Sequence, residues 1–300
     1  MWRVLNVVFS CAMEQSGVKK WSVFVQVAKL VAYFLLYQFV FMAVGQGVAF
    51  LAYNLCVEPV AYEVFREQPN ASMTEYATSG LSVAMLLSAL AMIAHLLVFK
   101  YVRIRRGFLH EVKGGVLLLS ILFIMCMMFV FNIVAVWLGL ENNLESEIDM
   151  MMNSVPGVLS IAVMAPLLEE LLFRGAIQGL LMRYFKNPWV GILVAALVFG
   201  VIHANPVQIF YAACLGVGFG WMYYRTGSLL PAVAGHILNN SMAVASALLW
   251  GSEEPDVTAG ITGEVMTVLF FSIMALLLIR LMEKRLPPVP SPWHEVSEGI

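Results

Sequence analysis

The sequence predicts an all-α, polytopic membrane protein, and two features of its composition lead to that fold class. Of its 300 residues, 61% are hydrophobic and only 12% are charged. Soluble domains contain roughly 45–50% apolar and about 25% charged residues, so this chain has too few polar side chains to cover a surface in water. Its formal net charge of −2 also excludes a general basic surface for nucleic acid.

The distribution of the apolar residues predicts about eight transmembrane helices. Runs of about 20 apolar residues, the length that crosses the hydrocarbon core, recur along the chain. The expected helices are residues 21–55, 80–99, 115–140, 155–184, 188–203, 206–224, 229–250 and 261–282. They divide the chain into an interfacial helix or unstructured tail at 1–20, three helices within 21–150, a core of four helices at 151–250, and a last helix with a cytoplasmic tail at 251–300.

Charged residues in the loops predict the orientation of these helices. Basic residues gather in every second loop, for example in 100–113 and 280–285, whereas the alternate loops 58–75, 141–149 and 253–256 are acidic. Cytoplasmic loops of membrane proteins carry an excess of Lys and Arg. We therefore expect both termini in the cytoplasm, and we expect the protein in a bacterial inner membrane.

The middle of the helix at 155–184 contains three charged residues, which are costly within a bilayer. Glu170 and Arg174 are four residues apart and share a helix face, so they can pair and reduce the cost of burial. Glu169 lies about 100° around the helix and has no such local partner. An unpaired carboxylate in this setting suits a general base, although an ion pair that merely holds helices together is the alternative.

Two histidines and an asparagine are further candidates in the same core. Glu169 and His203 each lie 17 residues from Lys186, so two antiparallel helices joined there would place them at the same depth. His236 and Asn240 share one face of a later helix, where an imidazole and an amide could donate to a developing oxyanion. The alternatives are an interfacial histidine at position 203 and ordinary hydrogen bonding between helices at 236 and 240.

Three short motifs now define a resemblance. Residues 169–174 (EELLFR), 199–203 (FGVIH) and 236–240 (HILNN) resemble, in order, the EExxxR, FxxxH and HxxxN/D motifs of the CAAX protease and bacteriocin-processing (CPBP) family, which includes the type II CAAX prenyl endopeptidases. The resemblance covers about residues 156–247. It implies an intramembrane endopeptidase with its active site inside the helix bundle, acting on prenylated CAAX-type or leader-type peptides associated with membrane lipid.

The resemblance also implies a role for each motif residue. Glu169 would activate the attacking water with help from His203, and His236 and Asn240 would form the oxyanion hole. Glu170, Arg174 and Phe199 would support the site. We favour a mechanism without a cofactor, because the chain has no HExxH pair. A zinc ion bound by Glu169, His203 and His236 is the minority alternative.

Two other classes of function are compatible with buried charges. A proton-coupled transporter could use the glutamates and histidines as a relay, but transporters usually contain repeated halves, and the eight unequal helices show no repeat. A non-catalytic scaffold or immunity protein of the same family would tolerate loss of motif residues, yet every motif position is filled.

Overall fold

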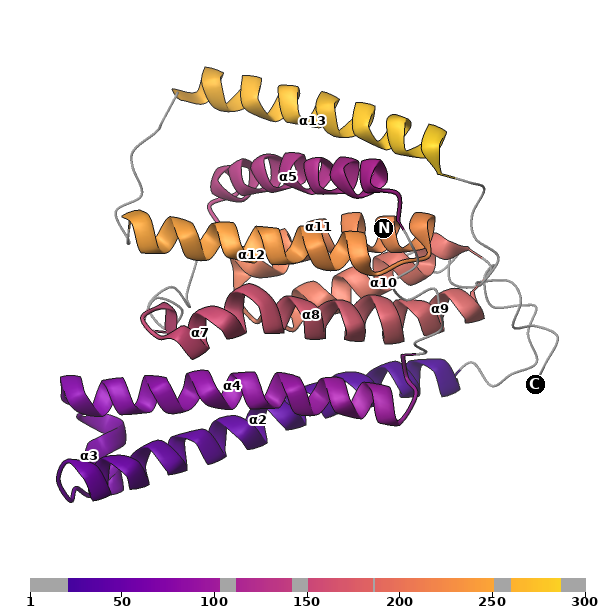
Figure 1. The fold of residues 1–300 in the computed structure, drawn as a ribbon. Helices are drawn as coiled ribbons and strands as arrows, with labels where there is room; N and C mark the ends of the chain where they lie inside the picture. Colours follow the sequence, from indigo (N-terminus) through magenta and orange to yellow (C-terminus); the bar gives the residue numbers. More distant parts are fainter. Residues whose placement is uncertain (1–20, 103–111, 142–150, 186, 251–259, 287–300) are drawn as a thin grey trace.

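A computed structural model describes residues 21–102, 112–141, 151–185, 187–250 and 260–286. These residues form helices and no strands, and a helix is present at each of the eight predicted positions, which confirms the all-α, polytopic fold class (Figure 1). The interfacial segment predicted at 1–20 and the tail from 287 to 300 lie outside the described residues.

The helix bounds follow the predicted ranges closely in most cases. The helices are α2 (Trp21–Cys56), the short α3 (Tyr62–Glu67), α4 (Ala71–Val98), α5 (Gly114–Trp137), a composite fourth crossing from Val155 to Tyr184, α10 (Pro188–Val201), α11 (Pro206–Thr226), α12 (Leu230–Trp250) and α13 (Gly260–Arg285). Within the described part of the chain, six are long and apolar enough to cross a membrane. α10 is shorter, with 14 residues, and α11 is not among the six.

Capping residues explain where several helices begin and end. α4 starts nine residues before the predicted position, because the Asn70 side chain accepts a hydrogen bond from the Met73 backbone N–H and caps the helix there. The Ser154 side chain caps the fourth crossing in the same way, by accepting from the Gly157 N–H. Gly227 ends α11 in the left-handed conformation, with φ 68°, that glycine adopts without strain.

The fourth crossing is a composite of α and π turns, which was not predicted. It runs through α7 (Val155–Leu159), the π-helical η1 (Ser160–Met164), α8 (Ala165–Glu169), the π-helical η2 (Glu170–Gln178) and α9 (Gly179–Tyr184). Pro166 accounts for η1, because a proline inside a helix has no N–H to donate and clashes with the carbonyl four residues earlier. π turns are rare and frequently mark functional sites.

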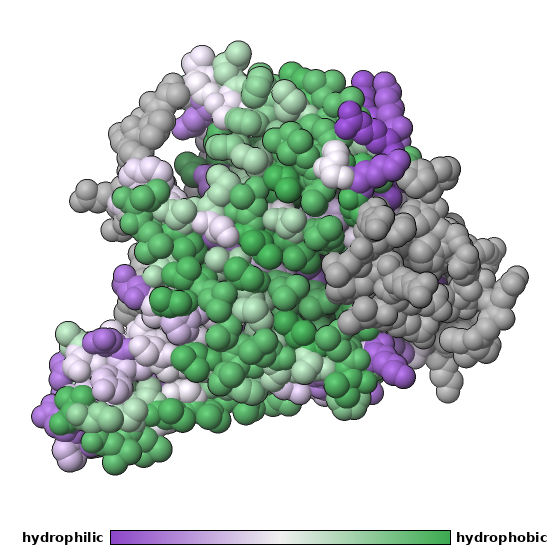
Figure 2. Space-filling model, viewed as in Figure 1, coloured by the Kyte–Doolittle hydropathy of each residue, from purple (hydrophilic) through white to green (hydrophobic). Residues whose placement is uncertain are grey.

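The helices are arranged as a central group flanked by two helix pairs (Figure 1). α2 and α4 pack together on one side, and α5 and α13 pack together on the other. The fourth crossing, α10, α11 and α12 lie between these two pairs, with α10 packed along α11. The outer face in Figure 2 is largely hydrophobic, and its hydrophilic residues gather toward the helix ends. This surface fits an integral, multi-pass membrane protein.

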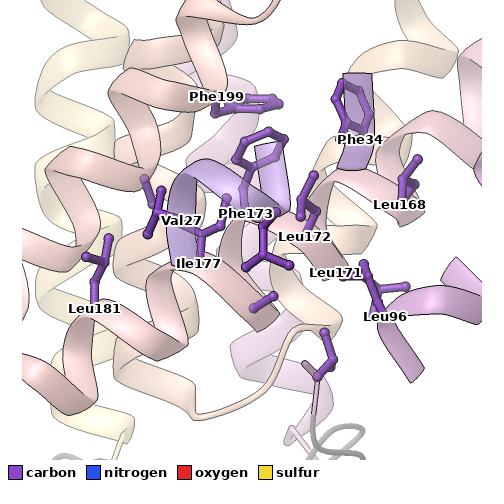
Figure 3. Packing of buried hydrophobic residues seen from close by; sticks show 14 of the residues in the cluster. Val27, Phe34, Leu96, Leu168, Leu171, Leu172, Phe173, Ile177, Leu181 and Phe199 are labelled. Carbon is purple, nitrogen blue, oxygen red and sulfur yellow. The ribbon is translucent and has the colours of Figure 1, made fainter. Parts of the chain in front are cut away.

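The main core lies where the fourth crossing meets α2, α4 and α10. Figure 3 shows Phe173 and Phe199 side by side, and their ring centroids are 5.1 Å apart. Leu172 and Ile177 in the same cluster are fully buried. Glu170, Arg174 and Gln178 on the same crossing are also fully buried, so these polar side chains are shielded from lipid by neighbouring helices.

Candidate active site

Glu170 and Arg174 form a salt bridge at the centre of the described helices, as their spacing predicts. Arg174 Nη1 lies 3.0 Å from Glu170 Oε1, and both side chains are fully buried. The guanidinium carbon also lies 4.4 Å from the ring centroid of Phe199 and 5.3 Å from that of Phe219. Two aromatic faces therefore stabilise a cation that has no contact with water.

His236 connects the two glutamates, a contact that the sequence did not predict. Its Nδ1 lies 2.8 Å from Glu170 Oε1, and its Nε2 lies 3.6 Å from Glu169 Oε2. Glu169 thus has a partner from another helix, and its side chain keeps 14% of its surface exposed whereas Glu170 keeps none. The more accessible of the two carboxylates is therefore the one at position 169.

The charges of this cluster can balance. Glu169, Glu170 and Arg174 together carry a formal charge of −1, and a protonated His236 would bring the sum to zero. In that form the ring donates through both nitrogens, to Glu170 through Nδ1 and toward Glu169 through Nε2. The cluster can therefore hold an imidazole N–H directed at the accessible carboxylate.

His203 lies near this cluster but makes different contacts. Its Nδ1 is 2.8 Å from the Phe199 carbonyl oxygen, one turn earlier in the same helical segment. The Phe199 ring contacts both histidines, with its centroid 5.1 Å from that of His203 and 5.7 Å from that of His236. Phe199 therefore links the two histidines, and the equal depth of Glu169 and His203 stays a prediction.

Asn240 faces the same crossing at a different level. Its Nδ2 donates to the Ile161 carbonyl in η1 at 2.9 Å, and its Oδ1 accepts from Asn239 Nδ2 at 2.9 Å. His236 and Asn240 thus both contact the fourth crossing from α12, as their shared helix face predicts. Asn239 was not predicted as part of the site.

Gln178 and Phe219 are buried site neighbours that sequence reasoning missed. Gln178 Nε2 donates to the Gly220 carbonyl at 2.8 Å, one turn along η2 from Arg174, whose Nη2 donates to the Gly216 carbonyl at 3.3 Å. A Cβ atom at Gly220 would lie 2.7 Å from Gln178 Oε1, so a larger residue would block this contact. Two glycines of α11 thus offer their carbonyls to two buried polar side chains.

The residues do not form an evident metal centre. No group of three or more His, Cys, Asp and Glu side chains in the described ranges is arranged to hold a metal ion. His203 points one ring nitrogen at a backbone carbonyl, and His236 Nδ1 is hydrogen-bonded to Glu170, whereas its Nε2 lies 3.6 Å from Glu169. The zinc alternative, with Glu169, His203 and His236 as ligands, stays a prediction.

Comparisons with known proteins match this part of the chain. Residues 151–242 match the family model described as type II CAAX prenyl endopeptidase Rce1-like, which confirms the resemblance indicated by the three motifs. The chain is also 26% identical over 112 residues to "Putative membrane peptidase YdiL" of Bacillus subtilis (strain 168). That match covers 37% of this chain and 46% of the relative, so the chain spans about half of the relative's length. No solved structure matches the chain.

Proposed function

Because residues 151–242 are related to the type II CAAX prenyl endopeptidases, we propose that this membrane protein is an intramembrane endopeptidase in which Glu169 activates water. The proposal rests above all on one observation. Two adjacent glutamates share His236, but only Glu169 is accessible, whereas Glu170 is fully buried against Arg174. The Glu169 carboxylate can therefore contact a reactant, whereas the Glu170 carboxylate holds Arg174 and His236 in place.

The proposed reaction begins with proton transfer to Glu169. The carboxylate takes a proton from a water molecule as the water oxygen attacks the scissile carbonyl carbon. The carbonyl π bond then opens to a tetrahedral oxyanion. Collapse of this intermediate breaks the C–N bond, and Glu169 returns the proton to the leaving amine. One group thus serves first as general base and then as general acid, and His203 helps to orient the water.

The oxyanion would be stabilised by donors from α12. Asn240 offers an amide N–H, and a protonated His236 offers Nε2–H once the reactant replaces its long, 3.6 Å contact with Glu169. Glu170 and Arg174 would keep His236 in place through Nδ1. In this reading Phe199 supports the site by packing against the Arg174 guanidinium.

The substrates that suit this site are peptides held at the membrane. A prenylated CAAX-type peptide and a bacteriocin or leader-type peptide present the same amide bond to the glutamate, so both belong to the proposal. We also propose that the protein lies in a bacterial inner membrane with cytoplasmic termini, since basic and acidic loops alternate along the sequence.

The direct test replaces Glu169 by glutamine in the full-length protein. Glu169→Gln keeps the size and shape of the side chain but cannot accept a proton, so cleavage should be abolished in a protein that still folds. Glu75→Gln is the matched control, because Glu75 is exposed at the start of α4. Both variants and the wild type would be assayed on a panel of prenylated and unprenylated peptides.

Two outcomes would count against the proposal. Wild-type turnover by purified Glu169→Gln would remove the general-base assignment. Failure of the wild type to cleave any peptide, together with proton-dependent transport into vesicles, would favour the transporter alternative instead.

A further inference from the structure

A chain of hydrogen bonds reaches Asn240 from another helix. The Tyr211 hydroxyl on α11 donates to Asn239 Oδ1 at 2.8 Å, Asn239 Nδ2 donates to Asn240 Oδ1 at 2.9 Å, and Asn240 Nδ2 donates to the Ile161 carbonyl at 2.9 Å. The chain therefore joins α11 to the π turn of the fourth crossing through two adjacent amides of α12. Tyr211 lies outside the three motifs, and Asn239 occupies a position of the third motif, HxxxN/D, at which the motif specifies no residue type.

This chain fixes the orientation of both amides. An asparagine side chain has an oxygen that only accepts and a nitrogen that only donates. A tyrosine hydroxyl that donates to Asn239 Oδ1 leaves the Asn239 nitrogen facing Asn240, which must then present its own oxygen. The Asn240 nitrogen consequently faces Ile161. Turning the Asn240 amide by 180° would bring two oxygens together at Ile161 and two nitrogens together at Asn239.

The acceptor at the end of the chain is available for a reason visible in the sequence. In a π turn the Ile161 carbonyl would accept from the residue five positions later, which is Pro166 and has no N–H. The Ala165 N–H, four positions later, donates to the Ser160 carbonyl instead. Asn240 therefore satisfies a carbonyl that the local backbone leaves open, and this holds one amide N–H of Asn240 in a fixed direction.

We propose that Tyr211 and Asn239 are positioning residues that hold the Asn240 amide in the orientation needed to stabilise the oxyanion. With one N–H of Asn240 bound to Ile161, its second N–H has a defined direction for the substrate. This proposal rests on the proposed peptidase function, because Asn240 is the group that meets the reactant. Tyr211 and Asn239 act only through it.

A double-mutant cycle tests this role. Tyr211→Phe removes the hydroxyl but keeps the ring, which packs against the cluster around Phe219. We expect kcat to fall about tenfold with KM unchanged, because a loosened catalytic group loses transition-state stabilisation while substrate binding persists. In the Asn240→Ala background the same change should cost nothing further. Tyr224→Phe on the same helix is the matched control and should retain wild-type kcat.

The outcomes separate this proposal from the proposed function. An equal loss of kcat from Tyr211→Phe in both backgrounds, or a change in KM alone, would overturn the positioning role. If the wild type cleaves no peptide, the proposed function fails. Thermal unfolding of the same four proteins then decides the matter: non-additive shifts in Tm support the hydrogen-bond chain, and additive shifts overturn it.

Discussion

α2 and the fourth crossing are two apolar helices of similar length and hydropathy, yet they have opposite environments. In the most apolar window of α2 only 17% of residues are buried, whereas 44% are buried in the corresponding window of the fourth crossing. α2 exposes large side chains such as Leu36 and Phe39. The fourth crossing instead buries Glu170, Arg174 and Gln178 among other helices.

This difference teaches that hydropathy identifies a crossing but not its role. Lipid can cover α2 because its exposed side chains are apolar. The fourth crossing tolerates buried charges because α11, α12 and the Phe199 ring supply carbonyls, an imidazole and an aromatic face at the matching positions. A functional helix in a membrane is therefore recognised by its polar residues and by the neighbours that satisfy them.

The largest effect is expected from breaking the buried ion pair. Arg174→Ala leaves Glu170 uncompensated in a dry interior and should cost about 3–5 kcal/mol of stability. Arg66→Ala removes a comparable Arg–Glu contact, with Glu67, that lies exposed beyond the end of α2, and it should leave stability unchanged. Equilibrium unfolding in mixed micelles measures both. Equal losses would contradict the distinction between the two environments.

The next largest effect is expected on kcat when the Asn240 amide, the proposed oxyanion donor on α12, is removed. Asn240→Ala should lower kcat by about 10²–10³ while KM changes little, because an oxyanion donor strengthens its contact only in the transition state. Wild-type activity should survive a chelator. Loss of activity to chelator and its recovery with zinc, together with loss of bound metal in His203→Ala and His236→Ala, would replace this mechanism by a metal-dependent one.

A smaller effect tests the apolar residues of the same two helices. Leu172 on the fourth crossing is fully buried, so Leu172→Ala should cost about 2–5 kcal/mol. Leu36 on α2 has 56% of its surface exposed, so Leu36→Ala should change stability by less than about 0.5 kcal/mol. If Leu36→Ala proves as damaging as Leu172→Ala, α2 must be covered by protein and not by lipid.

The smallest effect on stability and activity is expected from cysteine substitutions at exposed positions near helix ends, which test the orientation of the helices. In a variant whose native cysteines are replaced by alanine, Glu75→Cys should react with a membrane-impermeant thiol reagent from outside the cell. Lys113→Cys should react only after the membrane is opened. Both positions are exposed and flank helices at opposite predicted ends. The reverse pattern would invert the proposed orientation.

The sequence predicts most of the fold because hydropathy and loop charge are local signals. It locates all eight helices, with their ends usually within a few residues, and it predicts the pairing of Glu170 with Arg174. It misses the early start of α4, although Asn70 is a recognisable capping residue. It also misses the π turns, although Pro166 inside a long apolar run could have indicated one of them.

The parts of the site that escaped prediction depend on contacts between distant helices. Nothing local to His236 shows that its ring meets both glutamates, 66 residues away in the case of Glu170. Tyr211, Gln178 and Phe219 lie outside the motifs, and each is recognised as part of the site only when the residue that it contacts is known. A polar residue within an apolar helix is the one feature of the sequence that could have indicated such a contact, and Gln178 is a residue of this kind.

The spacing of Glu170 and Arg174 has a consequence for the biogenesis of the protein. Ribosomes deliver the fourth crossing before α11 and α12, so the Gly216 carbonyl and His236 are not yet present when Arg174 enters the bilayer. Glu170, one turn away on the same segment, is the counterion that is already there. The pair can thus enter the bilayer as a neutral unit. The later helices, including the short α10 and its partner α11, then enclose an Arg174 charge that Glu170 already neutralises.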